Sequence, residues 1–207
     1  FLIRGDESKL IPIDLKHKSG SNQMISVEKD SIGNWAYSIN FILEGLNVLS
    51  LRDQLSGPNP EPEDLDDSYY DITVDDKFQE EGYLFSKAKK PAFNDREEIV
   101  ILSPFKESIF YENPFLEARR TYPIDFDYPF YQNFELDMEI PEGYEVDEIP
   151  PSVSHFTPNK ELTYLLESKV EEGHIRVVSK LDIHVKNYSP RAYPELKSFA
   201  EKVSESV

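Results

Sequence analysis

Alternating apolar and polar residues run through most of the chain, which is the pattern of a strand with one buried face. In residues 174–185 (HIRVVSKLDIHV), one face holds Ile175, Val177, Leu181, Ile183 and Val185. Residues 162–170 precede this segment, and Gly173 between the two can adopt the positive φ that a tight turn needs. The two segments are therefore predicted to form a β-hairpin.

The same pattern predicts further strands along the chain. They are expected at residues 24–30, 34–45, 71–76, 82–88, 97–105 and 133–140. Trp35, Tyr37, Ile39 and Phe41 alternate with small or polar residues, so we expect these rings in a core and not on a carbohydrate-binding platform.

Helical spacing occurs in only two segments. Residues 46–58 are predicted to contain a short helix that ends at Ser56-Gly57-Pro58. Near the C-terminus, apolar residues recur at helical spacing, and Pro194 suits the first helical position. These apolar residues are Leu196, Phe199, Ala200 and Val203. The predicted fold class is mostly β, an antiparallel β-sandwich-like architecture with a short internal helix and a C-terminal helix at 194–205.

Two weak points divide the chain. Residues 57–68 are rich in proline and acidic residues and are predicted to form a mobile acidic loop. A second seam lies near residues 104–114. The chain is therefore predicted to comprise a β-rich unit at 1–105 and a β-rich C-terminal unit at 106–207, with one continuous β domain as the open alternative.

Charge and composition narrow the classes of function. Acids outnumber bases 40 to 22 among 207 residues, giving a net charge of −18 that repels nucleic-acid backbones and anionic membranes. The absence of cysteine excludes disulfides and thiolate chemistry. No apolar run is long enough to insert into a membrane. Since the sequence starts FLIRGDESK, without methionine or a signal-like region, we expect a piece of a longer protein.

Candidate catalytic groups are scattered. His17, His155, His174 and His184 lack the spacing of zinc ligands and are expected to be solvated. Ser31, Ser103 and Ser154 have no neighbouring base and no nucleophile-elbow motif. Glycine-rich phosphate loops are also absent from the sequence. We therefore predict no catalytic residues, no cofactor and no metal.

An alternative is an independent binding module for a glycan or calcium. The acids Asp64, Asp66, Asp67 and Asp71 are close together, but Tyr69 and Asp75 occupy the positions where a calcium-binding EF-hand loop needs glycine and glutamate. A solvated acidic loop is favoured over a metal site. The tyrosines that remain candidates for ligand contact are Tyr69, Tyr70, Tyr128 and Tyr131.

Three ordered motifs carry a resemblance: residues 113–130 (NPFLEARRTYPIDFDYPF), 140–150 (IPEGYEVDEIP) and 193–199 (YPELKSF). They resemble the C-terminal domain of unknown function that follows the transglutaminase-like core in a bacterial family of exported multidomain proteins. The matching residues are Arg119, Arg120, Pro123, Ile124, Asp125, Phe126, Pro141, Gly143, Tyr144, Val146, Ile149, Pro150, Tyr193, Leu196 and Phe199. Residues 26–55, with Gly45 and Arg52, more loosely resemble the segment after that core.

The resemblance implies an accessory role. The core of such proteins has a Cys-His-Asp triad, and this chain has no cysteine, so the triad is expected outside it. The chain is then a non-enzymatic domain that packs against the core in the same polypeptide, or presents it to a protein or cell-wall substrate. Its location would be periplasmic or secreted. The motif residues would be structural, with Arg119 or Arg120 paired to Asp125 or Asp127.

Overall fold

The structure, a computed structural model, describes residues 2–4, 7–9, 19–29, 34–48, 70–75, 83–93 and 99–206. Its main sheet contains β3 (Ser19–Lys29), β4 (Trp35–Glu44), β5 (Tyr70–Asp75), β6 (Tyr83–Phe93), β8 (Phe130–Glu139), β9 (Val153–Phe156), β10 (Leu162–Glu171) and β11 (His174–Ile183). Two small sheets pair β1 (Leu2–Arg4) with β2 (Glu7–Lys9) and β7 (Ile124–Asp125) with β12 (Asn187–Tyr188). Helix α2 spans Tyr193–Ser204.

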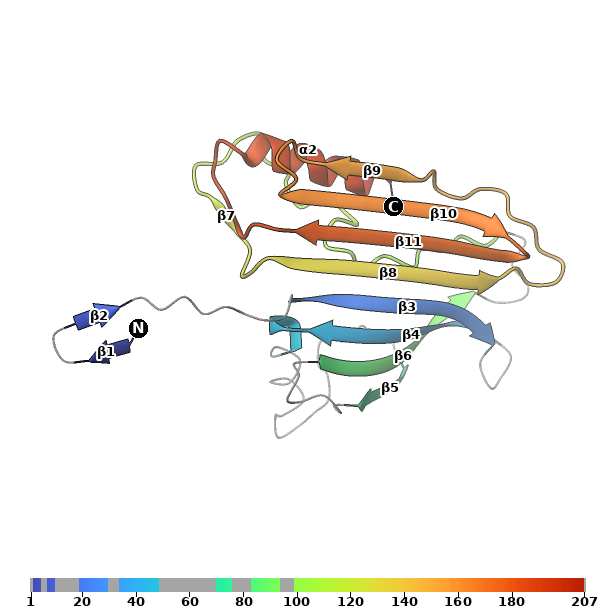
Figure 1. Ribbon diagram of the computed structural model, residues 1–207. Coiled ribbons are helices and arrows are strands. Elements are labelled where there is room, and N and C mark those ends of the chain that lie inside the picture. Colours follow the sequence, from blue (N-terminus) through green and yellow to red (C-terminus); the bar gives the residue numbers. More distant parts are fainter. Residues whose placement is uncertain are drawn as a thin grey trace.

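The eight strands of the main sheet lie in the order β5-β6-β4-β3-β8-β11-β10-β9 (Figure 1). All of its neighbouring strands are antiparallel except β3 and β8, which are parallel. Strands from both predicted units thus lie in one sheet and meet at this parallel pair. The division of the chain at residue 105 stays a prediction.

The mostly β prediction is confirmed, and so are the hairpin and the C-terminal helix. Strands β10 and β11 pair from Leu162↔Ile183 to Glu171↔His174, and Glu172 and Gly173 turn the chain with φ of 53° and 81°. Helix α2 starts one residue before its predicted range and has proline in its first turn. In the described part of the chain, the layer opposite the sheet is formed by α2 and by loop segments rather than by a second large sheet.

The apolar stripe of α2 forms the centre of the core. Leu196, Ala200 and Val203 are fully buried, and Phe199 is only 4% exposed. They pack in one cluster with the inner face of the sheet, which presents Phe134, Leu136, Leu166 and Leu181, among others. Burying each large apolar side chain contributes about 1.5–3 kcal/mol, so this stripe is what fixes the helix to the sheet.

One predicted strand is wrong in its described part. Residues 99–103 have no regular structure and 104–107 form a turn, in which Ser108 N donates to the Phe105 carbonyl at 2.9 Å. Pro104 lacks the amide hydrogen that a strand ladder needs, and the buried Phe105 holds the turn against the core. Of the predicted internal helix, residues 46–48 are helical; its remainder and the acidic loop at 57–68 lie outside the described residues.

Candidate functional site

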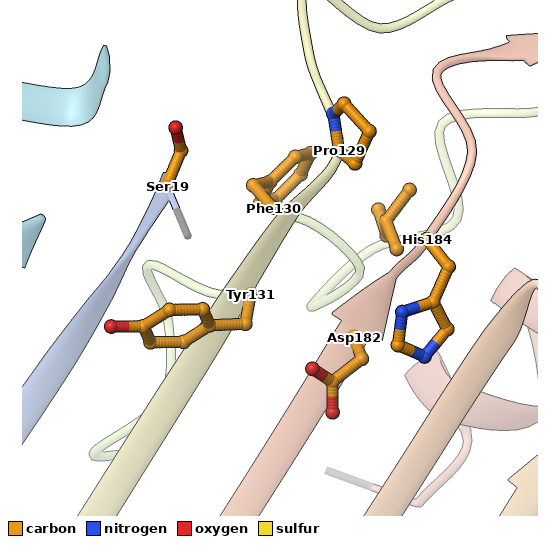
Figure 2. Close-up of a pocket in the computed structure, with 7 residues that line it drawn as sticks. Ser19, Pro129, Phe130, Tyr131, Asp182 and His184 are labelled. Carbon is orange, nitrogen blue, oxygen red and sulfur yellow. The ribbon is translucent and has the colours of Figure 1, made fainter. Parts of the chain in front are cut away.

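A small pocket opens at one end of three neighbouring strands, beside the first residues of β3 and β8 and the last residues of β11. Its volume is about 90 Å³, and it is lined by Ser19, Pro129, Phe130, Tyr131, Asp182, Ile183 and His184 (Figure 2). Sites for small organic ligands usually have volumes of about 300–1,000 Å³. This pocket has room for water or one short side chain, so it is too small to bind a whole substrate.

Two of the polar groups of this pocket, those of Ser19 and Tyr131, have partners within the protein. Ser19 Oγ accepts a hydrogen bond from the Leu46 amide at 3.1 Å. The Tyr131 hydroxyl accepts one from Asn22 Nδ2 at 3.2 Å, and the Tyr131 ring lies against Gly20. Ser19 therefore accepts a hydrogen bond from the helical turn at residues 46–48, and Tyr131 connects β8 to β3.

The pocket brings serine, histidine and aspartate together without joining them. Asp182 and His184 project from the end of β11 and the residues after it, whereas Ser19 lies beyond Phe130 (Figure 2). No hydrogen bond links any two of these three side chains in the described structure. A serine nucleophile needs a base within about 2.6–3.2 Å, so the arrangement does not form a catalytic triad.

The first motif forms a scaffold around β7 and α2. Pro123 and Asp125 are exposed, while Phe126 packs edge-on against Tyr188 and its amide donates to the Lys186 carbonyl at 2.7 Å. The predicted pairing of arginine with Asp125 or Asp127 is wrong: among the described residues neither arginine forms an ion pair. Instead, the Arg120 guanidinium lies 5.6 Å from the centre of the Tyr193 ring, because that ring faces the loop and offers a cation–π contact.

The second motif forms the turn after β8. The Tyr144 amide donates to the Pro141 carbonyl at 3.1 Å, and Gly143 has a φ of 89°, a conformation that favours glycine. The Tyr144 ring meets Phe93 edge-on at 6.2 Å. The Pro150 carbonyl accepts a hydrogen bond from Ser168 Oγ. These contacts tie the turn to β6 on one side and β10 on the other.

The third motif lies in α2 and contacts the first. Leu196 and Phe199 are core residues, and Phe199 packs edge-on against Phe110 at 6.1 Å. Tyr193 is 1% exposed and donates its hydroxyl to the Glu117 carbonyl at 2.8 Å. The structure therefore brings the first and third motifs together, over 76 residues of sequence.

A network of charged side chains lies on the outer face of the sheet. Asp137 Oδ1 lies 2.7 Å from His174 Nδ1, and its other oxygen accepts from Arg176 Nε at 2.9 Å. The hydrogen bond from His174 and the charge of Arg176 lower the pKa of Asp137. Arg176 also reaches Glu171, whose pKa is lowered chiefly by its hydrogen bond to Lys169. His174 was predicted to be a solvated surface residue; its side chain is 37% exposed, and it also has Asp137 as a partner, because strand register places the nearby Arg176 directly opposite Asp137.

His155 belongs to β9 and is partly enclosed by Tyr164 of β10 and by the end of α2. Its ring stacks on Tyr164 with centroids 6.3 Å apart, and Nε2 lies 3.1 Å from Ser206 Oγ. Burial and then the charge of Lys202 lower the pKa of His155. His155 is thus half-buried rather than fully solvated as expected, whereas His184 is exposed as expected.

The candidate ligand-binding tyrosines separate into two groups. Tyr128 donates its hydroxyl to Asn47, and Tyr131 covers Gly20, so both contact neighbouring strands or turns. Tyr69, the side chain of Tyr70 and the acidic loop lie outside the described residues, as do His17 and Ser31. Within the described part, no three His, Cys, Asp or Glu side chains are placed to hold a metal ion, and no helix is both long and apolar enough to cross a membrane.

Contacts between distant motifs are what sequence reasoning missed. The Lys197 ammonium donates to the carbonyls of Leu116 and Glu117 at 2.9 and 3.2 Å. Nothing in the spacing of either segment indicates this pairing. The Asp137–His174–Arg176 group was missed for the same reason, because it depends on the pairing of β8 with β11, which the β10–β11 hairpin does not specify.

A family model described as "Domain of Unknown Function with solved-structure structure (DUF3858)" matches residues 97–206. The matched segment, 110 of 207 residues, is more than half of the chain and contains all three motifs. The chain belongs to the DUF3858 family. Strands β3–β6, which precede the matched segment, extend the sheet of the DUF3858 domain through the β3–β8 pair.

No curated protein matches the sequence. The DUF3858 chain is similar to a crystal structure, at 2.00 Å resolution, of a "putative protease" from Parabacteroides distasonis ATCC 8503. The two share 11% sequence identity with a TM-score of 0.40, over 52% of this chain and 20% of the other. The DUF3858 chain thus spans about one fifth of the length of that protein.

Proposed function

We propose that this chain is a non-catalytic accessory region that follows a transglutaminase-like core in a longer polypeptide. In that role it packs against the core, or presents the core to a protein or cell-wall substrate. We also propose that the polypeptide is exported to the periplasm or beyond, on the basis of the same family resemblance.

The proposal rests mainly on one observation: several motif residues are buried or packed against one another and do not line a cleft. Tyr193, Leu196 and Phe199 are buried, and the Tyr193 hydroxyl is occupied by the Glu117 carbonyl. Phe126 and Tyr144 pack against other rings. Residues that act on a substrate expose reactive atoms in a cleft, whereas these residues contact one another. Their arrangement suits a scaffold.

The polar groups of the small pocket add support. Ser19 and Tyr131 are engaged in hydrogen bonds between elements, and Asp182 and His184 are not joined to a nucleophile. Acyl transfer needs a nucleophile, a base and oxyanion donors that converge on one point. No such group of residues is found in the described part of the chain.

The test of the proposal begins with the purified chain. We expect no incorporation of a fluorescent amine into casein and no peptide-bond hydrolysis above the buffer background. Turnover that disappears on replacing a single side chain, such as Ser19→Ala or His184→Gln, would contradict the proposal. Ser198→Ala, an exposed change on α2, serves as the control for handling and folding.

Association with the core is the second part of the test. The core and this chain are produced as separate polypeptides and mixed, and their binding is measured by calorimetry. We expect a one-to-one complex, since accessory domains that pack against a core bury a specific interface. Failure to bind, at concentrations well above micromolar, would remove the packing role.

A further inference from the structure

Two large apolar side chains stand out from the surface near the start of α2. Leu116 is 82% exposed and Tyr122 is 80% exposed. They lie near the two ends of residues 116–123, which we name the docking loop, and every residue of this loop is exposed. Single apolar residues on a surface are ordinary, but here two of them flank a pair of arginines.

The docking loop is held firmly at both ends. Before it, Phe115 is buried and packs edge-on against Tyr193 at 6.1 Å. Within it, the carbonyls of Leu116 and Glu117 accept hydrogen bonds from Lys197 and Tyr193 of α2. After it, β7 pairs with β12. A loop fixed in this way loses little conformational entropy when it binds a partner.

The two arginines of the docking loop lack acidic partners. Arg119 and Arg120 are exposed, and neither forms an ion pair with any described residue. Arg120 rests over the Tyr193 ring, which orients its guanidinium. The chain has 40 acids and 22 bases, yet no carboxylate of a described residue lies within ion-pair distance of these two adjacent arginines. The loop itself holds one acid, Glu117, so its formal charge is +1 in a chain of −18.

We propose that the docking loop binds an acidic polypeptide segment that also carries an apolar or aromatic side chain. The guanidiniums of Arg119 and Arg120 pair with carboxylates, for which their planar donors are suited. Leu116 and Tyr122 contact the apolar side chain, in keeping with the frequent use of tyrosine and arginine at the centres of protein interfaces. This inference goes beyond the accessory role, because it does not require the partner to be a transglutaminase-like core.

The probe is a random copolymer of glutamate and tyrosine, and poly-glutamate is its comparison. Binding to the purified chain is measured by calorimetry at low and at physiological salt. Because the whole chain repels polyanions, non-specific binding of this probe is disfavoured. We expect saturable binding of the glutamate–tyrosine copolymer, at least fivefold tighter than that of poly-glutamate, and weaker at higher salt.

Three variants locate the binding. Arg119→Glu and Tyr122→Ser change exposed side chains, and each is expected to weaken binding of the copolymer at least fivefold. Lys180→Glu makes the same charge change as Arg119→Glu at an exposed site on β11 and is expected to change the affinity less than twofold. Unchanged thermal unfolding of all three variants verifies that the fold is retained.

Several outcomes would overturn the proposal. The wild-type chain fails to bind the copolymer, or Lys180→Glu weakens binding as much as Arg119→Glu does. A third is self-association of the chain that is lost on Arg119→Glu, seen by light scattering, since it would identify a second copy as the occupant of the docking loop. If Arg119→Glu and Tyr122→Ser lose binding and Lys180→Glu does not, the proposal is supported. This holds whether or not the chain binds a transglutaminase-like core.

Discussion

The ring of Tyr131 lies directly against Gly20 across the parallel pair of β3 and β8. A Cβ atom on residue 20 would come within 2.5 Å of Tyr131 Cδ1. Next to this contact, Asn22 donates to the Tyr131 hydroxyl and accepts from Asn133 Nδ2 at 2.8 Å. Gly20 and Asn22 come from the first half of the chain and Tyr131 and Asn133 from the second, so this group joins the two halves of the sheet.

Gly20→Ala is predicted to destabilise the chain by about 1–3 kcal/mol, because the added methyl group must displace the Tyr131 ring. The free energy of unfolding is measured by urea denaturation with far-ultraviolet circular dichroism. The double variant Gly20→Ala/Tyr131→Ala tests the cause. Without the Tyr131 ring, the Gly20→Ala change should lower the free energy of unfolding by less than it does when Tyr131 is present. Equal costs in both backgrounds would contradict the steric explanation.

Leu196→Ala is predicted to lower the free energy of unfolding by about 2–5 kcal/mol, since it opens a cavity at a fully buried position between α2 and the sheet. Ser198→Ala, on the exposed side of the same helix, is the matched control and should change stability by less than about 0.5 kcal/mol. If Leu196→Ala lowered the free energy of unfolding as little as the control does, it would contradict the packing of α2 on the sheet.

Tyr193→Phe removes only the hydroxyl that donates to the Glu117 carbonyl, so the expected cost is about 0.5–1.5 kcal/mol. Lys197 donates to the same carbonyl, which limits the penalty. Tyr122→Phe makes the same chemical change at an 80% exposed residue and should be neutral. Thermal unfolding of the two variants side by side gives the difference; equal melting temperatures would argue against the contact between the first and third motifs.

His155 makes stability depend on pH. Its pKa in the folded chain is lowered from the ordinary value of 6.5, mainly by burial, so the unfolded chain binds the proton more tightly. The free energy of unfolding is therefore predicted to fall as pH drops below about 6.5, and this loss ends below the folded-state pKa. Above pH 6.5 the effect is absent.

The measurement is urea denaturation at pH 7.5, 6.5 and 5.5 for the wild type and His155→Gln. The variant should lose less stability than the wild type as the pH falls. His184→Gln, at an exposed residue, should follow the wild type. Parallel curves for the wild type and His155→Gln would show that His155 is not the group responsible.

Strong local patterns made much of the fold predictable. Alternating apolar and polar residues predicted β8, β10 and β11. Gly173 predicted the hairpin turn, and the helical spacing of Leu196 and Phe199 predicted α2. Each of these depends on residues that are neighbours in sequence. The segment at 97–105 misled because its apolar run looks like a strand, whereas Pro104 and the buried Phe105 favour a turn.

Long-range relationships were not predictable from a single sequence. The parallel pairing of β3 with β8 joins segments about 110 residues apart, and no local pattern specifies it. The contacts of Tyr193 with Glu117 and Arg120 likewise depend on how α2 packs beside the docking loop. An ion pair between Arg120 and Asp125 was plausible from charge alone, but the position of the Tyr193 ring decides where the guanidinium lies.

The most direct test of the accessory role is to read the coding sequence upstream of the codon for Phe1. The account predicts an open reading frame of a few hundred codons that encodes a cysteine followed by histidine and aspartate, as in a transglutaminase-like core. A stop codon in frame shortly before Phe1, or a long upstream region without such a triad, would contradict it.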